Sequence, residues 1–407
     1  MEGAKRIIEK REKYLLPGVK HAYESPPLLV SAYMQYIYDD ADVRYTDFFS
    51  GYSVVNCGHS NPFILENIIN QLKGFQHTNN SYLTEPIVQL AERLARLLPA
   101  SLNRSFFCSS WSEATETALV LARNIKGRRK IIALEGGLHG RTHLAMSASH
   151  MSEWRTDPFL SEDVVFIPNA SEPKESLKRL KELLDEEPES YCALIAEIIQ
   201  GNGGIITPQG DYFAEIIELL HQKEAIFIAD ERESGFARTG KLFAFEHFGI
   251  VPDVLVYANA LGNGMPIAGF TAVEEVAKMF TKAHISTLGG NPASCAAGLA
   301  VLDYIEYNDL ERTALRKGEV LGEALEGVAE KYLNKYGYEA KVRGIGLMMG
   351  LKVDHVCNPS SVIERMKDKG FIIGLAGTEK DVLIFQPPIV IEESDILEMA
   401  DALIKII

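Results

Sequence analysis

Short apolar segments that alternate with helical segments constrain the fold of this chain more than any other feature. The apolar segments are residues 104–110, 130–136, 164–169, 191–199, 225–230 and 254–259, and segments with helical spacing of apolar residues include 112–125, 171–187 and 211–224. The apolar segments show no alternation with polar residues, which is typical of strands buried on both faces. The pattern therefore predicts an α/β domain with a mostly parallel sheet between two layers of helices.

A change of pattern near residue 295 predicts a second domain. Long helical segments there are followed by apolar segments at residues 338–353, 370–377 and 382–391, which indicate a small α+β domain. We divide the chain into a large α/β domain of residues 46–295 and a small C-terminal domain of residues 296–407. Residues 1–45 form an N-terminal segment that we expect to pack with the small domain or a partner subunit. At a finer level, Ser171 is the expected N-cap of the helix at 171–187.

The composition is that of an acidic globular protein. The chain has 407 residues, 46% hydrophobic and 24% charged, and a net charge of −15. This negative charge argues against a nucleic acid or an anionic membrane as partner. No segment is long enough to span a bilayer and the N-terminus lacks a signal peptide, so we expect a cytoplasmic location. The five cysteines lack C-x-x-C spacing, so we expect reduced thiols and no metal site; they are Cys57, Cys108, Cys192, Cys295 and Cys357.

Five ordered motifs carry a resemblance to a known family. They are "FFCSSWSEATETALVLAR" at 106–123, "LHGRTHLAMSAS" at 138–149, "EIIQGNGGI" at 197–205, residues 228–269, and "TLGGNPASCAAG" at 287–298. With these motifs the chain resembles the class III aminotransferases of the ornithine and 4-aminobutyrate type, which depend on pyridoxal phosphate. The resemblance implies fold type I, with a mostly parallel seven-stranded sheet in the large domain. It also implies a homodimer.

The resemblance assigns ancestral cofactor positions to this sequence. Asp230 matches the strand-end Asp that pairs with the pyridinium nitrogen of the cofactor. Ser110 and Ser112 lie in the turn at a helix N-terminus that cups the phosphate. Thr287 matches a threonine that reaches the phosphate from the partner subunit, and His139 belongs to the element that follows the ring-stacking aromatic.

The same motifs depart from the family at the positions that do the chemistry. Asn259 stands where the family has the lysine that forms an imine with the cofactor, and Trp111 replaces a glycine in the phosphate turn. We expect the indole to occupy space that the phosphate needs. The other departures lie around the same pocket: Leu138 and Leu288 replace aromatic residues, Arg232 a small apolar residue, Glu233 a Gln, Ile384 an Arg and Asn202 a Glu.

Because the changes fall on one pocket while the scaffold motifs are intact, we interpret them as a remodelled cofactor site. We expect no transaminase activity and no covalently bound cofactor, with the ancestral pyridoxal phosphate lost. An engineered pocket is the favoured interpretation, and a natural pseudoenzyme or an inactive mutant are the alternatives. The joint loss of the family's Arg at position 384 and Glu at position 202 fits deliberate repacking, since losing only one of them would leave the other as a buried charge without a partner.

The altered pocket is expected to accept a small, aromatic molecule, with Tyr52 and Ser81 also lining it. Glu233 or Asp230 is a candidate general base. A second possibility is a nucleophile, Cys108, Ser109 or Ser110, activated by His139. Two alternatives remain open: Glu233 pairs with Arg232 without catalysis, or the pocket binds a ligand without turning it over.

Overall fold

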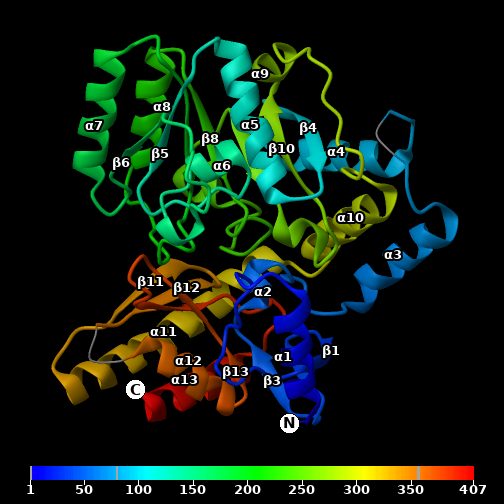
Figure 1. Ribbon diagram of the computed structural model, residues 1–407, viewed down its shortest axis with the longest axis vertical. Helices are drawn as coiled ribbons and strands as arrows, with labels where there is room; N and C mark the ends of the chain where they lie inside the picture. Colours follow the sequence, from blue (N-terminus) through cyan, green and yellow to red (C-terminus); the bar gives the residue numbers. More distant parts are fainter. Residues whose placement is uncertain (1, 79–80, 355–357) are drawn as a thin grey trace.

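A seven-stranded sheet forms the centre of the large domain (Figure 1). The structure is a computed structural model that describes residues 2–78, 81–354 and 358–407. The strand order is β4-β10-β9-β8-β7-β5-β6, and β5 to β9 pair in parallel. The expected mostly parallel seven-stranded sheet is confirmed. The strand bounds are β4 (Leu102–Cys108), β5 (Lys130–Leu134), β6 (Val164–Ile167), β7 (Tyr191–Glu197), β8 (Ile226–Asp230), β9 (Val254–Tyr257) and β10 (Ala268–Val273).

Successive side chains of the central strands enter opposite cores, as a pleated strand requires. In β8, Ile226 and Ile228 belong to one apolar cluster, and Phe227 and Ala229 belong to the other. The first cluster lies under α5 (Trp111–Lys126) and α6 (His143–Ser147). The second lies under α7 (Pro173–Glu186), α8 (Tyr212–Gln222) and α10 (Pro292–Tyr307). Burial of both faces explains why these strand sequences are apolar throughout.

The N-terminal strands join the C-terminal part of the chain. β1 (Leu29–Tyr33), β2 (Tyr36–Asp39) and β3 (Arg44–Asp47) form an antiparallel sheet, and β13 (Phe371–Ile372) pairs with β3 in parallel. A second antiparallel sheet contains β11 (Lys341–Ile345), β12 (Met348–Lys352), β15 (Val382–Phe385) and β14 (Gly374–Ala376). Helices α11 (Leu310–Tyr336), α12 (Pro359–Asp368) and α13 (Glu393–Ile406) pack around these sheets, next to the N-terminal α1 (Glu2–Tyr14) in Figure 1. The other helices are α2 (Ser50–Ser53), α3 (Pro62–Gly74), α4 (Glu85–Leu97) and α9 (Glu274–Lys278), with short 3-10 helices η1 (Ser152–Trp154), η2 (Ala244–Phe248) and η3 (Asn259–Gly262).

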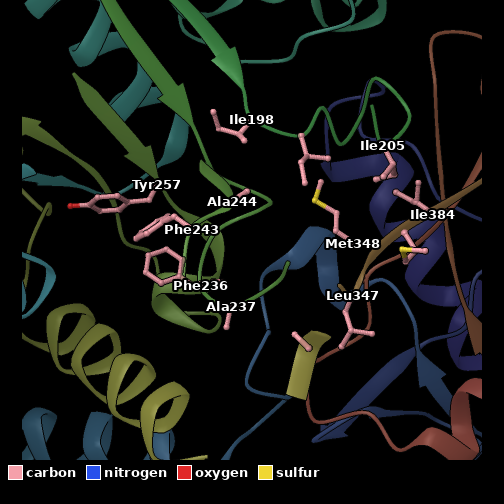
Figure 2. Packing of buried hydrophobic residues seen from close by; sticks show 14 of the residues in the cluster. Ile198, Ile205, Phe236, Ala237, Phe243, Ala244, Tyr257, Leu347, Met348 and Ile384 are labelled. Atoms are coloured by element: carbon pink, nitrogen blue, oxygen red, sulfur yellow. The ribbon is translucent and has the colours of Figure 1, made fainter. Parts of the chain in front are cut away.

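One apolar core connects the large sheet with the C-terminal sheet (Figure 2). Phe236 and Phe243 come from the loop after β8, and Met348 and Ile384 come from the C-terminal strands. Ile384 is 2% exposed and pairs in register with Gly350. Within one chain Ile384 is a buried core residue, and, contrary to the expectation from the sequence, it does not line either of the two cavities near Trp111.

Four of the five cysteines, Cys57, Cys108, Cys192 and Cys295, are free and buried, and Cys357 lies outside the described residues. Among the described residues, no helix combines the length and the apolar content that crossing a membrane requires.

Candidate functional site

Asp230, at the carboxyl end of β8, is the centre of a buried hydrogen-bond cluster. The Nε1–H of Trp111 donates to both carboxylate oxygens, at 3.1 and 3.0 Å. Nδ1 of His139 lies 2.9 Å from Oδ2, and the backbone N–H of Arg232 donates to Oδ1 over 3.2 Å. Since a carboxylate only accepts, the proton of His139 lies on Nδ1. Asp230 is 1% exposed, so protein groups rather than water meet its hydrogen-bonding capacity.

Trp111 is the first residue of α5, and this position directs its side chain beyond the helix end. The Ser110 hydroxyl caps the helix by accepting from the Glu113 N–H at 3.3 Å. Because Cα–Cβ bonds of a helix tilt toward its N-terminus, the indole projects past the helix end and reaches Asp230. The indole was expected to obstruct the phosphate turn. In the structure the indole extends past the helix end and hydrogen-bonds to Asp230, the residue that the resemblance assigns to the ring nitrogen of the cofactor.

Arg232 covers the indole of Trp111 and carries a buried charge. Its guanidinium carbon lies 4.0 Å from the ring centroid, which is a cation–π contact. Burial lowers the pKa of Arg232, but the carboxylates of Glu233, Glu197 and Asp230 outweigh it and raise the pKa above its ordinary value. The ion-pair partner is Glu233, and Glu197 Oε1 lies 3.9 Å away.

Glu233 is held on both of its carboxylate oxygens. Besides Arg232, Asn202 Nδ2 donates to Oε1 over 2.9 Å, and Gln386 Nε2 donates to Oε2 over 3.4 Å. The residue is 4% exposed. Glu233 thus pairs with Arg232, and its role as a general base stays a prediction. Nearby, burial raises the pKa of Glu197 well above its ordinary range, although Arg232 acts in the opposite direction.

Asn259 follows β9 and begins η3. Its Nδ2 donates to the backbone carbonyl oxygen of Tyr52 over 2.9 Å. Its φ of 47° lies in the left-handed region, which Asn adopts more readily than most residues. The side chain therefore ties the turn after β9 to the segment around Tyr52.

A cavity of about 300 Å³ opens beside Trp111. Six residues predicted to line the pocket do line it: Tyr52, Trp111, Leu138, Asn202, Arg232 and Asn259. Sequence reasoning missed the other lining residues, Gly51, Val54, Arg141 and Trp154. Trp154 and Trp111 are the only tryptophans of the chain, and that rarity was the available signal. A second cavity of about 360 Å³ shares Tyr52, Trp154 and Asn202 with the first and extends to Lys20 and Lys380.

Three predicted residues lie elsewhere in the chain. Ser81, Thr287 and Leu288 are exposed and do not line the cavity of their own chain. For Thr287 and Leu288 this agrees with a position facing a partner subunit, which stays a prediction. Ser112 lies near the pocket, and its Oγ accepts from the Arg141 N–H over 3.0 Å.

The proposed nucleophile and His139 are not hydrogen-bonded to each other. His139 Nδ1 is bound to Asp230, and its buried Nε2 has no partner among the described residues. Cys108 donates its thiol to the Ser110 carbonyl oxygen at 3.4 Å, and burial, with Glu113 nearby, raises its pKa to about 12. Since the thiolate is the reactive form, Cys108 is a poor nucleophile here.

The layered sheet, the strand-end Asp and the helix N-terminus beside it define an aminotransferase-type α/β fold. The family model described as aminotransferase class-III matches residues 21–407, so the chain belongs to the class III aminotransferase family. It is 35% identical to the acetylornithine aminotransferase of Methanocaldococcus jannaschii over 386 residues, which covers 93% of this chain and 92% of that protein. It is 34% identical to the mitochondrial alanine–glyoxylate aminotransferase 2 homolog 2 of Arabidopsis thaliana over 406 residues, covering 96% and 84%.

Solved structures agree with this fold. A Bacillus anthracis aminotransferase superposes with a TM-score of 0.92 at 27% identity, covering 100% of this chain and 98% of that one. The family is one of pyridoxal-phosphate-dependent enzymes. Within this chain, however, the acceptor expected for the ring nitrogen already binds the Trp111 indole, and position 259 carries an amide in place of an amine.

Proposed function

We propose that this chain is a class III aminotransferase scaffold that has lost transamination and binds a small aromatic molecule beside the former cofactor position. The hydrogen bonds from the Trp111 indole to both oxygens of Asp230 carry the proposal. By the family resemblance, that carboxylate is the one that pairs with the ring nitrogen of the cofactor. Because protein interiors are close-packed, an indole and a pyridine ring exclude each other from one position.

Position 259 supports the proposal independently. The family lysine supplies the amine that forms the imine and moves a proton. The carboxamide of Asn259 has no basic nitrogen, and its Nδ2 already donates to the Tyr52 carbonyl oxygen. The residues of this chain therefore do not fit a covalently held pyridoxal phosphate.

The cavity supports the ligand-binding part of the proposal. A volume of about 300 Å³ lies at the lower end of the range for small-molecule pockets. Tyr52, Trp111 and Trp154 give it aromatic walls, which suit a flat apolar molecule.

The test is an absorbance spectrum after incubation with pyridoxal phosphate and dialysis. We expect no retained cofactor in the unaltered chain. Asn259→Lys restores the amine but leaves the indole on Asp230, so we expect this variant to retain cofactor poorly. The triple variant Trp111→Gly, Arg232→Val, Asn259→Lys removes both obstacles and should retain it. Retention by the unaltered chain, or transamination by Asn259→Lys alone, contradicts the proposal.

The contacts among the changed residues support a coordinated remodelling rather than one inactivating change. Trp111 contacts Arg232, Arg232 pairs with Glu233, and Glu233 accepts from Asn202. Engineering and natural divergence could each give such a set. A parent sequence that differs only at these positions favours engineering, and a natural sequence with Trp111 and Asn259 favours a pseudoenzyme.

A homodimer is part of the proposal. Leu288 is 58% exposed and Ile285 is 60% exposed in one chain, although both are large and apolar. Their neighbour Thr287 matches the residue that reaches a partner's site in the family. Burial of this segment against a second copy accounts for its composition.

A further inference from the structure

All four residues of α2 (Ser50–Ser53) have a left-handed backbone. Their φ values are 52° at Ser50, 59° at Gly51, 68° at Tyr52 and 54° at Ser53. A left-handed backbone brings Cβ too close to the following carbonyl oxygen, so residues other than glycine rarely adopt it in succession. Only Gly51 escapes this penalty, and α2 therefore persists only where contacts from outside the turn hold it.

The first half of α2 is held by contacts that precede Tyr52. Oδ1 of Asp47 accepts hydrogen bonds from the backbone N–H groups of Phe49 and Ser50, at 2.8 and 2.9 Å. The Ser50 hydroxyl donates to the backbone carbonyl oxygen of Gln386 over 2.6 Å. These contacts fix the entry to the turn and leave its second half to another partner.

Asn259 is that partner. Its Nδ2 donates to the Tyr52 carbonyl oxygen over 2.9 Å, and among the described residues no other side chain hydrogen-bonds to the backbone of Tyr52. The rest of the turn is closed by its own backbone, where the N–H groups of Tyr52 and Ser53 donate to the Phe49 carbonyl oxygen at 3.1 and 3.3 Å. The amide of Asn259 thus ties the strained half of the turn to the end of β9.

This turn forms a wall of the cavity beside Trp111. Gly51, Tyr52 and Val54 line that cavity, and Tyr52 also lines the second cavity. The rings of Phe49 and Tyr52 lie against each other, with centroids 4.2 Å apart. A shift of the turn would therefore change both cavities at once.

We propose that Asn259 is a positioning residue, whose amide holds the left-handed turn and with it the Tyr52 ring in the wall shared by the two cavities. The residue at the family's lysine position then shapes the cavity, in addition to lacking the amine. This role goes beyond the proposed function, which uses only the missing amine at position 259.

Asn259→Asp and Asn259→Gly test this role, because both residues tolerate a left-handed backbone and neither an ionised Asp nor Gly has a side-chain donor. We expect hydrogen–deuterium exchange at the amides of residues 52–54 to rise roughly two- to tenfold. Acrylamide quenching of fluorescence should rise too, because both tryptophans of the chain, Trp111 and Trp154, line the cavity. Thermal unfolding establishes that each variant is folded, and if Asn259→Asp does not fold, Asn259→Gly decides alone.

Asn263→Asp is the matched control. Asn263 follows the same 3-10 helix η3, has a left-handed φ of 44°, and its Nδ2 donates to the Gly58 carbonyl oxygen over 2.9 Å. This variant loses a comparable hydrogen bond and gains the same charge. We expect it to leave both the exchange at residues 52–54 and the acrylamide quenching unchanged.

Ser53→Gly provides a rescue that a merely destabilised protein would not show. Ser53 has a left-handed backbone, and its buried hydroxyl has no hydrogen-bond partner among the described residues. Glycine adopts this conformation without the steric penalty, so it favours the turn. Added to Asn259→Asp or Asn259→Gly, Ser53→Gly should restore part of the protection at residues 52–54.

Each outcome decides for or against the role of Asn259. Unchanged exchange at residues 52–54 in folded Asn259→Gly overturns it, and so does an equal rise in Asn263→Asp. Raised exchange without raised quenching overturns the link between the turn and the cavity. A rise of both signals that Ser53→Gly partly reverses supports the role. Retention of pyridoxal phosphate by the unaltered chain would overturn the proposed function alone, since neither signal depends on the cofactor.

Discussion

At the scale of single residues, the Trp111 indole is one of the groups that satisfy the buried carboxylate of Asp230. A buried carboxylate without hydrogen-bond donors costs several kcal/mol. The indole N–H supplies a donor to both oxygens, and His139 and the Arg232 N–H complete the set. Trp111 and Asp230 therefore form one functional pair, and a change at either affects the other.

Trp111→Phe tests this pair because it keeps an aromatic ring and removes the N–H. We expect a loss of about 1.5–3 kcal/mol in the free energy of unfolding, the usual contribution of a hydrogen bond to a charged group. Urea denaturation measures it. Trp111→Gly should lose more, and added indole should restore part of its thermal stability, whereas N-methylindole should not. Equal rescue by both compounds would contradict a role for the N–H.

Glu233→Gln tests whether the ion pair is structural. The change removes the carboxylate that pairs directly with the buried guanidinium of Arg232, so we expect a loss of roughly 3 kcal/mol in unfolding free energy. The double variant Arg232→Met, Glu233→Gln removes both charges and should be less destabilised than the sum of the single variants. If some turnover is found in the unaltered chain and Glu233→Gln reduces it by about 10²-fold at unchanged stability, Glu233 is a general base after all.

From the sequence, it was easier to predict which residues surround the cavity than to predict which contacts their side chains make. Trp111, Leu138 and Asn259, which the motifs placed at the pocket, all line the cavity. The direction of the indole could not be predicted, since it depends on Arg232 above the ring and on the acceptor Asp230 at the end of β8. Trp154 was missed because it lies outside every motif, at the end of the short helix η1, which only the tertiary fold brings to the pocket.

At the scale of elements, strands and helices were predictable where the pattern was local. β10 (Ala268–Val273), which is antiparallel to both of its neighbours, was missed. Ser171 was expected to cap α7, but Glu172 occupies the cap position without a side-chain hydrogen bond. The Ser171 hydroxyl instead donates to Asn169 Oδ1 over 2.7 Å. This local hydrogen bond competes with capping of the helix, and composition does not reveal it.

The cap of α5 is an element-scale prediction, because it holds the helix end from which Trp111 projects. Ser110→Ala removes the hydroxyl that accepts from the Glu113 N–H, and we expect a loss of about 1 kcal/mol. Ser110→Gly is the matched control. Because glycine is an acceptable N-cap, this variant should lose only ~0.3 kcal/mol in the free energy of unfolding. Thermal or urea unfolding measures both. Equal losses for the two variants would show that the hydroxyl is not the cap.

At the scale of the whole molecule, the site depends on segments that are far apart in the sequence. The second cavity combines Lys20 of the N-terminal segment, Trp154 of the large domain and Lys380 from the C-terminal part. Spacing along the chain cannot predict such a meeting, because only the tertiary fold brings these three segments together. Several large apolar side chains also remain exposed in one chain, at Leu65, Ile69 and Leu72 of α3 and at Tyr82, Leu83 and Val88.

We expect the homodimer to cover these exposed apolar residues. Leu83 is fully exposed in one chain, which is unfavourable for a leucine unless a second copy covers it. Leu83→Lys places a charge at the expected contact, and we expect the dissociation constant to rise at least about tenfold. Leu397→Lys, at an exposed leucine of α13, is the matched control and should leave the dimer unchanged. Sedimentation velocity at micromolar concentration measures both, and a monomeric unaltered chain would refute the dimer.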